Sequence, residues 1–87
     1  MAITKAMTAE ELKPIIFRVI GQIAPEADCS RLNPAENIQS ALDIDSFDFL
    51  NLLIGLNEEL GVEVPEADYA QVSTLNGLVA YLLAHMG

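Results

Sequence analysis

The fold is decided by one stretch of sequence, Leu42-Asp43-Ile44-Asp45-Ser46-Phe47-Asp48, and by the apolar residues that follow it up to Gly61. Asp45 followed three residues later by Asp48 is typical of a helix start, with Asp45 as the cap. Nothing before Leu60 breaks a helix except Gly55, which a helix tolerates. Gly61 supplies a left-handed C-terminal cap. We therefore predict a helix that begins at Ser46 and ends at Leu60.

This helix is too apolar to bury every side. Its core side chains are expected to be Phe49, Leu50, Leu52, Leu53, Leu56 and Leu60. Phe47 and Ile54 are the expected exceptions, exposed to solvent. An exposed apolar side on a helix is typical of a surface that docks partners.

The residues before this helix predict a first helix and a long loop. Thr8 and Glu11 form a capping box, and helical spacing follows in Ile15, Ile16, Val19, Ile20 and Ile23. We predict a helix over 9–23, kinked or delayed by Pro14 and ended by Pro25. Polar residues and scattered apolar ones over 24–44 predict a long loop anchored by Leu32, Ile38 and Leu42.

The C-terminal third predicts two further helices. Residues 62–65 read as an extended connector ending in Pro65, and Glu66 to Gln71 can form a short helical turn. Ser73-Thr74 then caps a last helix with apolar residues at Leu75, Leu78, Val79, Leu82 and Leu83. The predicted fold class is all-α. It is one domain over 1–87, a small four-helix bundle with three main helices, a short third helix and a long loop between the first two.

Charge is distributed unevenly along the chain. The net charge is −9, and the basic residues Lys5, Lys13, Arg18 and Arg31 all precede residue 32. The rest of the chain carries acids only: Glu36, Asp43, Asp45, Asp48, Glu58, Glu59, Glu63, Glu66 and Asp68. Such a field repels nucleic acid and anionic lipid, so we expect neither as a partner. A basic protein partner fits.

The sequence carries no signal for an oxidising compartment or a membrane. Cys29 is the one cysteine, so no intramolecular disulfide can form. Met1 to Met7 lack the apolar stretch of a secretory signal, and the longest apolar run, Leu78 to Ala84, is too short to span a bilayer. We expect a cytoplasmic protein without a membrane span.

Few residues offer catalytic or metal-binding chemistry. His85 lies in the last turn of the last helix, where it favours the negative helix end, and Cys29 lies in a polar loop as a bystander. No Cys and His cluster suits zinc, and no Gly-rich phosphate loop exists. Asp43, Asp45 and Asp48 fail the calcium-loop pattern because Phe47 occupies a ligand position. We predict no catalytic residue, no metal and no enzymatic activity.

Ser46 is the remaining candidate for chemistry. The local pattern alone is compatible with a simple helix cap. Helical N–H groups and the helix dipole would also favour a phosphate attached at this position. Asp45 and Asp48 oppose such an anion, so they are better explained as contacts for a basic enzyme.

The stretch from Leu42 to Asp48 resembles the Asp-Ser-Leu signature of acyl carrier proteins. The similarity continues through Glu58, Glu59 and Gly61, the extended Val-Pro connector and the short third helix. It implies that a phosphopantetheinyl transferase, assisted by Mg²⁺, attaches 4′-phosphopantetheine from coenzyme A to Ser46. It further implies that acyl-loading and acyl-transfer enzymes use the arm's thiol as a thioester carrier, and that the apolar interior shelters the acyl chain. By the same resemblance the chain is a monomer and catalyses nothing itself.

The chain departs from a typical fatty-acid carrier on the exposed side of the Ser46 helix. Asn51 and Asn57 stand where Glu is expected, and Phe47 follows the serine instead of Leu. Fewer carboxylates weaken steering by basic patches, and an exposed Phe shifts the contact toward apolar packing. We therefore predict a specialised carrier in a lipid, fatty-acid or secondary-metabolite pathway. The expected partner contacts are Asp45, Phe47, Asp48, Asn51, Ile54 and Glu58.

Two other functions remain open. A peptidyl or aminoacyl carrier would use the same arm, but such carriers usually show Gly-Gly where this chain has Asp43-Ile44. An unmodified acidic helical adaptor would use Ser46 only as a cap. Ser46→Ala separates these classes, because a carrier loses all loading whereas an adaptor keeps its partner.

Overall fold

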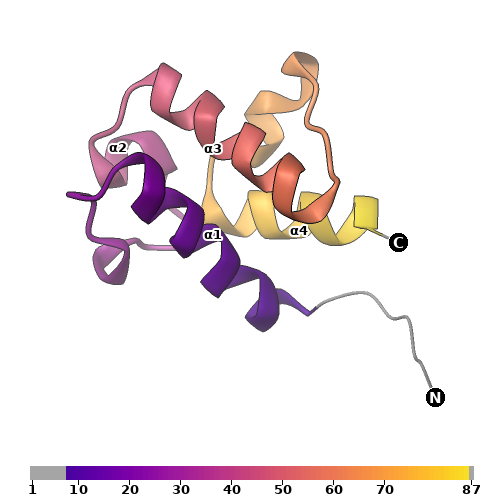
Figure 1. The fold of residues 1–87 in the computed structure, drawn as a ribbon, viewed down its shortest axis with the longest axis horizontal. Coiled ribbons are helices and arrows are strands. Elements are labelled where there is room, and N and C mark those ends of the chain that lie inside the picture. The colour runs from indigo at the N-terminus through magenta and orange to yellow at the C-terminus, as the bar shows by residue number, and fades with distance from the viewer. Residues whose placement is uncertain (1–7, 87) are drawn as a thin grey trace.

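The structure, a computed structural model, describes residues 8–86, apart from the side chain of Arg31. Its elements, shown in Figure 1, are α1 (Ala9–Ile23), η1 (Cys29–Arg31), α2 (Ile38–Leu42), α3 (Ser46–Leu60), η2 (Glu66–Val72) and α4 (Leu75–Met86), where η marks a 3₁₀ helix. The all-α class is confirmed, and the four predicted helices correspond to α1, α3, η2 and α4. The expectation for residues 1–7 falls outside the described part of the chain.

The predicted capping box begins α1. The Thr8 hydroxyl accepts from the Glu11 N–H at 3.2 Å, and the Glu11 carboxylate accepts from the Thr8 N–H at 2.8 Å. Pro14 lies inside the helix, but α1 still begins at Ala9, so the predicted delay is wrong. Pro14 has no N–H, so one backbone hydrogen bond of α1 is missing at this residue. Because Pro14 is exposed, the missing bond lies on the solvent side of the helix.

The predicted bounds of α3 are also confirmed. The Asp45 side chain accepts from the Asp48 N–H at 2.9 Å, and Gly61 ends the helix with a φ of 73°. Gly55 has a packing role, because a Cβ there would lie 2.6 Å from Cγ1 of the buried Val19. The glycine thus lets α3 approach α1 closely.

The segment over 24–44 is more ordered than the predicted long loop, because it contains η1 and α2. The Asn37 side chain caps α2 by accepting from the Ser40 N–H at 3.1 Å, and Asp43 ends it in the left-handed region with a φ of 56°. A helix of five residues is too short to show a repeating apolar pattern. The expected anchors Leu32, Ile38 and Leu42 are buried.

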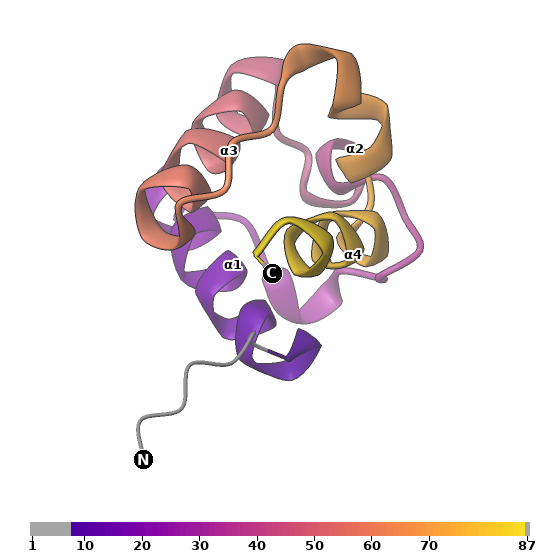
Figure 2. The same cartoon turned by 90° about the vertical axis from the view of Figure 1, so that its right-hand side faces the viewer.

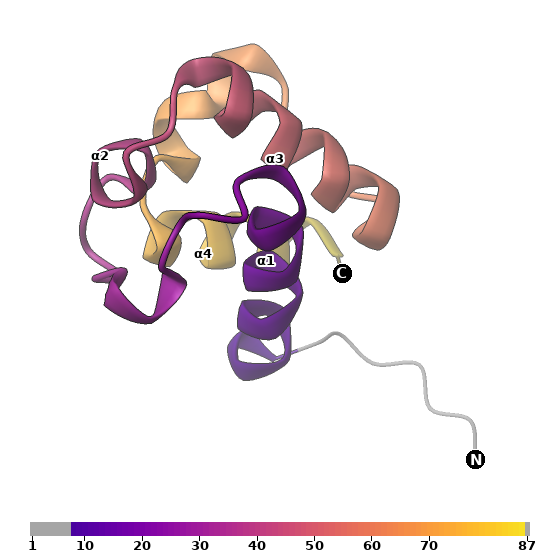
Figure 3. The same cartoon turned by 60° about the vertical axis from the view of Figure 1, so that its left-hand side comes forward.

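One continuous core joins the helices. Helix α1 packs against both α3 and α4, and η2 packs against α4. Figure 2 shows α1 and α3 on one side of the molecule with α4 and η2 on the other, and Figure 3 shows α1 crossing in front of α4. The most deeply buried side chains are Leu12, Ile16, Ile20, Ile38, Leu52, Leu56, Val72, Leu75, Leu78 and Leu82.

The prediction for the core of α3 is wrong at one position. Phe49, Leu52, Leu53 and Leu56 are buried as expected and Leu60 is half-buried against the core, but Leu50 is 37% exposed. The helical repeat places Leu50 near the side of α3 that carries Phe47 and Ile54, away from the side that α1 covers.

The junction between η2 and α4 is tight. Thr74 caps α4 as predicted, since its hydroxyl accepts from the Gly77 N–H at 3.0 Å. A Cβ at Gly77 would lie 2.3 Å from the carbonyl oxygen of Gln71, so a larger residue there would push η2 and α4 apart. The Ile38 N–H donates to the Ser73 carbonyl at 2.7 Å, which ties α2 to the same junction.

No helix within residues 8–86 combines the length and the apolar character that crossing a membrane requires.

Candidate functional site

Ser46 is the first residue of α3 and is exposed. The capping role belongs to Asp45, whose carboxylate accepts from the Asp48 N–H. Within residues 8–86 the Ser46 hydroxyl has no hydrogen-bond partner, so it is not needed to complete the helix start. The structure therefore presents a free hydroxyl at the positive end of a 15-residue helix.

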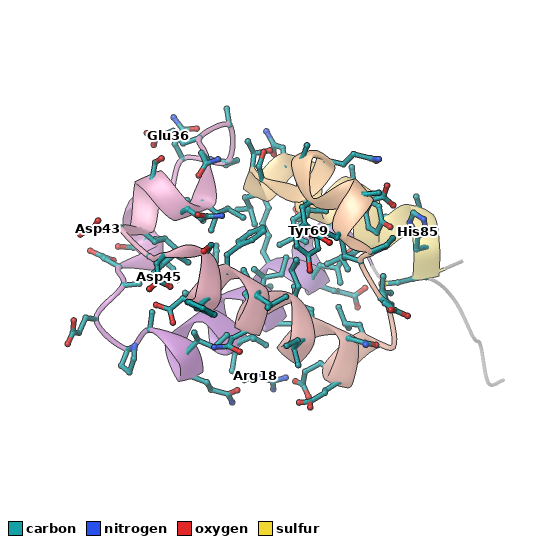
Figure 4. The ribbon with its side chains drawn as sticks, turned by 90° about the horizontal axis from the view of Figure 1, so that it is seen from above. Arg18, Glu36, Asp43, Asp45, Tyr69 and His85 are labelled. Carbon is teal, nitrogen blue, oxygen red and sulfur yellow. The ribbon has the colours of Figure 1, made fainter. Side chains whose placement is uncertain are left out.

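Three carboxylates, those of Asp43, Asp45 and Asp48, lie within three residues of Ser46 in the sequence. Asp43 and Asp45 are exposed and lie at one end of the molecule, opposite the end that carries His85, as Figure 4 shows. Arg18 forms an ion pair with Glu59 in the last turn of α3, about 20 Å along the helix axis from Ser46. The acidic end is therefore suited to meet positive charge brought by another molecule.

Four of the six residues predicted as partner contacts share one side of α3. Phe47, Asn51, Ile54 and Glu58 recur at spacings of three and four residues and are all exposed, and Asp45 is exposed just before the helix. Asp48 is half-buried and lies toward the α1 side.

An apolar stripe runs along this side of α3, formed by Phe47, Leu50 and Ile54, which are 75%, 37% and 47% exposed. Sequence reasoning missed Leu50 as part of it. The available signal was its spacing, three residues after Phe47 and four before Ile54.

Two cavities adjoin α3. The larger, of about 430 Å³, is the loop cavity, which lies between the chain after α1 and the α2–α3 turn, with Asp48 in its wall. The smaller, of about 170 Å³, is the helix cavity. The helix cavity is lined by Leu50, Leu53, Ile54, Asn57, Glu63, Val64 and Tyr69. The apolar stripe thus leads from beside Ser46 to the mouth of the helix cavity.

The residues set aside in the sequence lie away from Ser46. Cys29 is half-buried in η1, and burial together with the negative Asp28 raises the pKa of its thiol, which disfavours the nucleophilic thiolate. His85 stacks on Tyr81 with ring centroids 4.0 Å apart. Its Nδ1 lies 2.9 Å from the Tyr81 carbonyl oxygen, to which it donates because a carbonyl can only accept. Within residues 8–86, no three His, Cys, Asp or Glu side chains gather as a metal site would require.

Comparison with known proteins points to one family. The family model described as "Phosphopantetheine attachment site" matches residues 14–82. An acyl carrier protein of Lactobacillus johnsonii is 33% identical over 82 residues, covering 91% of this chain and 98% of that protein. A meromycolate extension acyl carrier protein of Mycobacterium leprae is 27% identical over 77 residues, covering 88% of this chain and 66% of that one.

A solved structure shares the fold. The solution structure of a candidate acyl carrier protein from Anaplasma phagocytophilum superposes with a TM-score of 0.74, at 20% identity, covering 93% of this chain and 94% of that one. The family's cofactor, phosphopantetheine, is joined through a phosphate, and a free, exposed hydroxyl at a helix N-terminus suits that chemistry. The chain belongs to the phosphopantetheine-attachment family of acyl carrier proteins.

Proposed function

We propose that this chain carries acyl groups as thioesters on a 4′-phosphopantetheine arm attached to the Ser46 hydroxyl. The observation that carries the proposal is the state of that hydroxyl. It is exposed, it has no partner within residues 8–86, and the capping role beside it is filled by Asp45. A phosphate on Ser46 Oγ would face the unpaired N–H groups of the first turn of α3.

We assign attachment to an external enzyme, because no side chain within residues 8–86 is hydrogen-bonded to the Ser46 hydroxyl as a general base would be. Asp45 is engaged as the helix cap, and His85 lies at the opposite end of the molecule. Ser46 Oγ forms the new bond to the phosphorus that bears pantetheine, and the anhydride bond of coenzyme A breaks. Adenosine 3′,5′-bisphosphate leaves, and the hydroxyl proton passes to a base of the phosphopantetheinyl transferase. Ser46 is thus a substrate residue, and the chain has no catalytic residue of its own.

The chain's own residues bind and orient partners. When attached, the arm supplies a thiol that holds acyl groups. Asp45 and Asp48 attract basic patches on the transferase and on acyl-loading and acyl-transfer enzymes. Phe47 and Ile54 add apolar contact area on the same side of α3.

We further propose a dedicated partner set in a specialised lipid, fatty-acid or secondary-metabolite pathway. Asn51 and Glu58 flank the apolar stripe, so this side of α3 combines few charges with a large exposed aromatic ring. The high net charge of −9 disfavours self-association, so the proposed form is a monomer in the cytoplasm. Use of this carrier by housekeeping fatty-acid enzymes at the rate of the standard carrier would contradict the dedicated role.

The helix cavity is the proposed shelter for the acyl chain. Leu50 and Ile54 belong both to its lining and to the apolar stripe, so an acyl chain leaving the Ser46 end meets apolar side chains along the way. Burying each methylene there is favourable by about 0.8 kcal/mol.

Intact mass tests the attachment site. The protein, Ser46→Ala and Ser40→Ala are each incubated with coenzyme A, Mg²⁺ and a broad-specificity phosphopantetheinyl transferase. Ser40 is a matched control, since it is an exposed serine in α2. We expect the phosphopantetheine mass increase on the native chain and on Ser40→Ala, and none on Ser46→Ala. No increase on the native chain, under conditions that load a known carrier, would favour the adaptor function instead.

A further inference from the structure

A buried tyrosine links α4 to η2. Tyr81 is 7% exposed, and its hydroxyl donates to the Asp68 carboxylate at 2.7 Å. This hydrogen bond raises the pKa of Tyr81, with further contributions from burial and from the negative charges of Asp68 and Glu63. The ring also stacks on His85 within α4. Asp68 and Tyr81 lie in different elements, and their bond fixes the distance between them.

The two ends of η2 are held differently. Its C-terminal end is anchored by the fully buried Val72 and by the close approach of Gln71 to Gly77. Its N-terminal end has no side-chain cap at Pro65. Among residues 8–86, the bond from Tyr81 is the one side-chain hydrogen bond that joins η2 to another helix. Loss of this bond therefore removes the side-chain tie between the middle of η2 and α4, while the C-terminal anchor remains.

One residue of η2 also lines the helix cavity. Tyr69, the residue after Asp68, lines the cavity together with Glu63 and Val64 of the connector. The facing wall comes from α3, and Figure 2 shows the connector running from the end of α3 to η2. Asp68 precedes Tyr69 directly, so a shift of η2 at Asp68 would move the Tyr69 side of this wall relative to α3.

We propose that Tyr81, through its hydrogen bond to Asp68, is a positioning residue that limits the length of acyl chain the helix cavity shelters. This inference rests on the carrier function proposed above. The cavity volume of about 170 Å³ equals that of about six water molecules, and a methylene group is of similar size. With η2 held by Tyr81, the cavity fits a chain of about six carbons. A longer chain requires η2 to move away from α3.

The test measures how well each acyl chain is protected. The native protein and its variants are loaded with saturated chains of increasing length, from butanoyl to dodecanoyl, and the rate of thioester cleavage by hydroxylamine is followed by mass. In the native protein we expect hexanoyl to be cleaved most slowly. Tyr81→Phe keeps the ring stacked on His85 but loses the hydroxyl. In this variant we expect hydroxylamine to cleave the hexanoyl thioester about 3-fold faster and the dodecanoyl thioester about 3-fold more slowly. Loss of one hydrogen bond predicts a change of about this size.

Three variants separate positioning from stability. Asp68→Ala removes the same bond from the other side, together with the bond from Gln71 Nε2 within η2, and is expected to give the same shift in chain length. Asp68→Asn keeps a hydrogen-bonding group opposite the Tyr81 hydroxyl and is expected to restore the native profile. Thr8→Ala removes the α1 cap, far along the chain from η2, and lowers stability without touching the cavity wall. It is expected to keep the native profile.

Hydrogen exchange gives a second readout on the unloaded protein. Backbone amides of residues 66–69 are expected to exchange faster in Tyr81→Phe than in Thr8→Ala. If Tyr81→Phe loads normally and keeps the native chain-length profile, the inference about Tyr81 is refuted while the carrier function stands. The same holds if Tyr81→Phe and Thr8→Ala change the cleavage rate of all acyl chains equally. Failure of the native chain to load refutes the carrier function and this inference with it.

Discussion

Replacing Gly77 by alanine tests how closely η2 and α4 pack. In the structure, a Cβ at residue 77 would stand 2.3 Å from the Gln71 carbonyl oxygen, whereas ordinary contacts begin at 3.4 Å. The obstructing atom belongs to the backbone, so the two elements must separate by about 1 Å, which is overpacking with a typical cost of about 1–3 kcal/mol. The Thr74 cap bond to the Gly77 N–H, 3.0 Å long, would be strained as well.

Alanine also has a higher helix propensity than glycine, and this gain must be subtracted from the cost of the overpacking. In a helix interior it is favoured over glycine by about 1 kcal/mol, which roughly offsets the loss of the cap bond. The net loss in the free energy of unfolding is therefore about 1–3 kcal/mol, and the melting temperature should fall by about 5–20 °C for a domain of this size. Thermal unfolding followed by circular dichroism measures this directly.

Gly21→Ala is the matched control. Gly21 lies in α1, and a Cβ there would have nothing within 4 Å. This substitution should therefore stabilise the protein by about 0.5–1 kcal/mol. If Gly77→Ala melted at or above the native temperature while Gly21→Ala behaved as expected, the close approach of η2 to α4 would be wrong.

Two further predictions concern Tyr81 and Phe47. Ultraviolet titration should show a raised pKa for Tyr81, and Asp68→Ala should lower that pKa because it removes the hydrogen bond that is the main cause of the shift. Because the folded pKa of Tyr81 is raised, its contribution to stability is present below the unfolded pKa of about 10 and is lost as pH rises through the folded value. Stability that did not fall in this alkaline range would contradict the hydrogen bond. Phe47→Ala, at a 75% exposed position, should leave stability within about 0.5 kcal/mol yet slow acyl transfer by partner enzymes. The matched Phe49→Ala, at a buried position, should cost about 3–5 kcal/mol. Equal transfer rates for Phe47→Ala and the native carrier would remove Phe47 from the docking surface.

Much of the secondary structure could be predicted because its causes are local. The caps of α1 and α3 each join residues three positions apart, and Gly61 ends α3 within the same turn. A sequence displays such short-range signals directly. The bounds of both long helices followed from them.

The candidate site could be predicted only in part. The sequence placed Ser46 at the start of a helix, but a serine there is compatible with either a cap or a free hydroxyl. The side-chain geometry decided between the two, since Asp45 accepts the bond from the Asp48 N–H and leaves Ser46 without a role in the helix.

Tertiary structure alone decided the features that depend on distant residues. Helix α2 is joined to the α4 junction through the Ile38 N–H and the Ser73 carbonyl, and its five residues carry no periodic signal. Leu50 is exposed because α1 covers the other side of α3. Tyr81 meets Asp68 only because η2 folds back onto α4. Local propensity thus determined where the helices begin and end, whereas packing between helices determined which apolar side chains stay exposed and which polar groups meet.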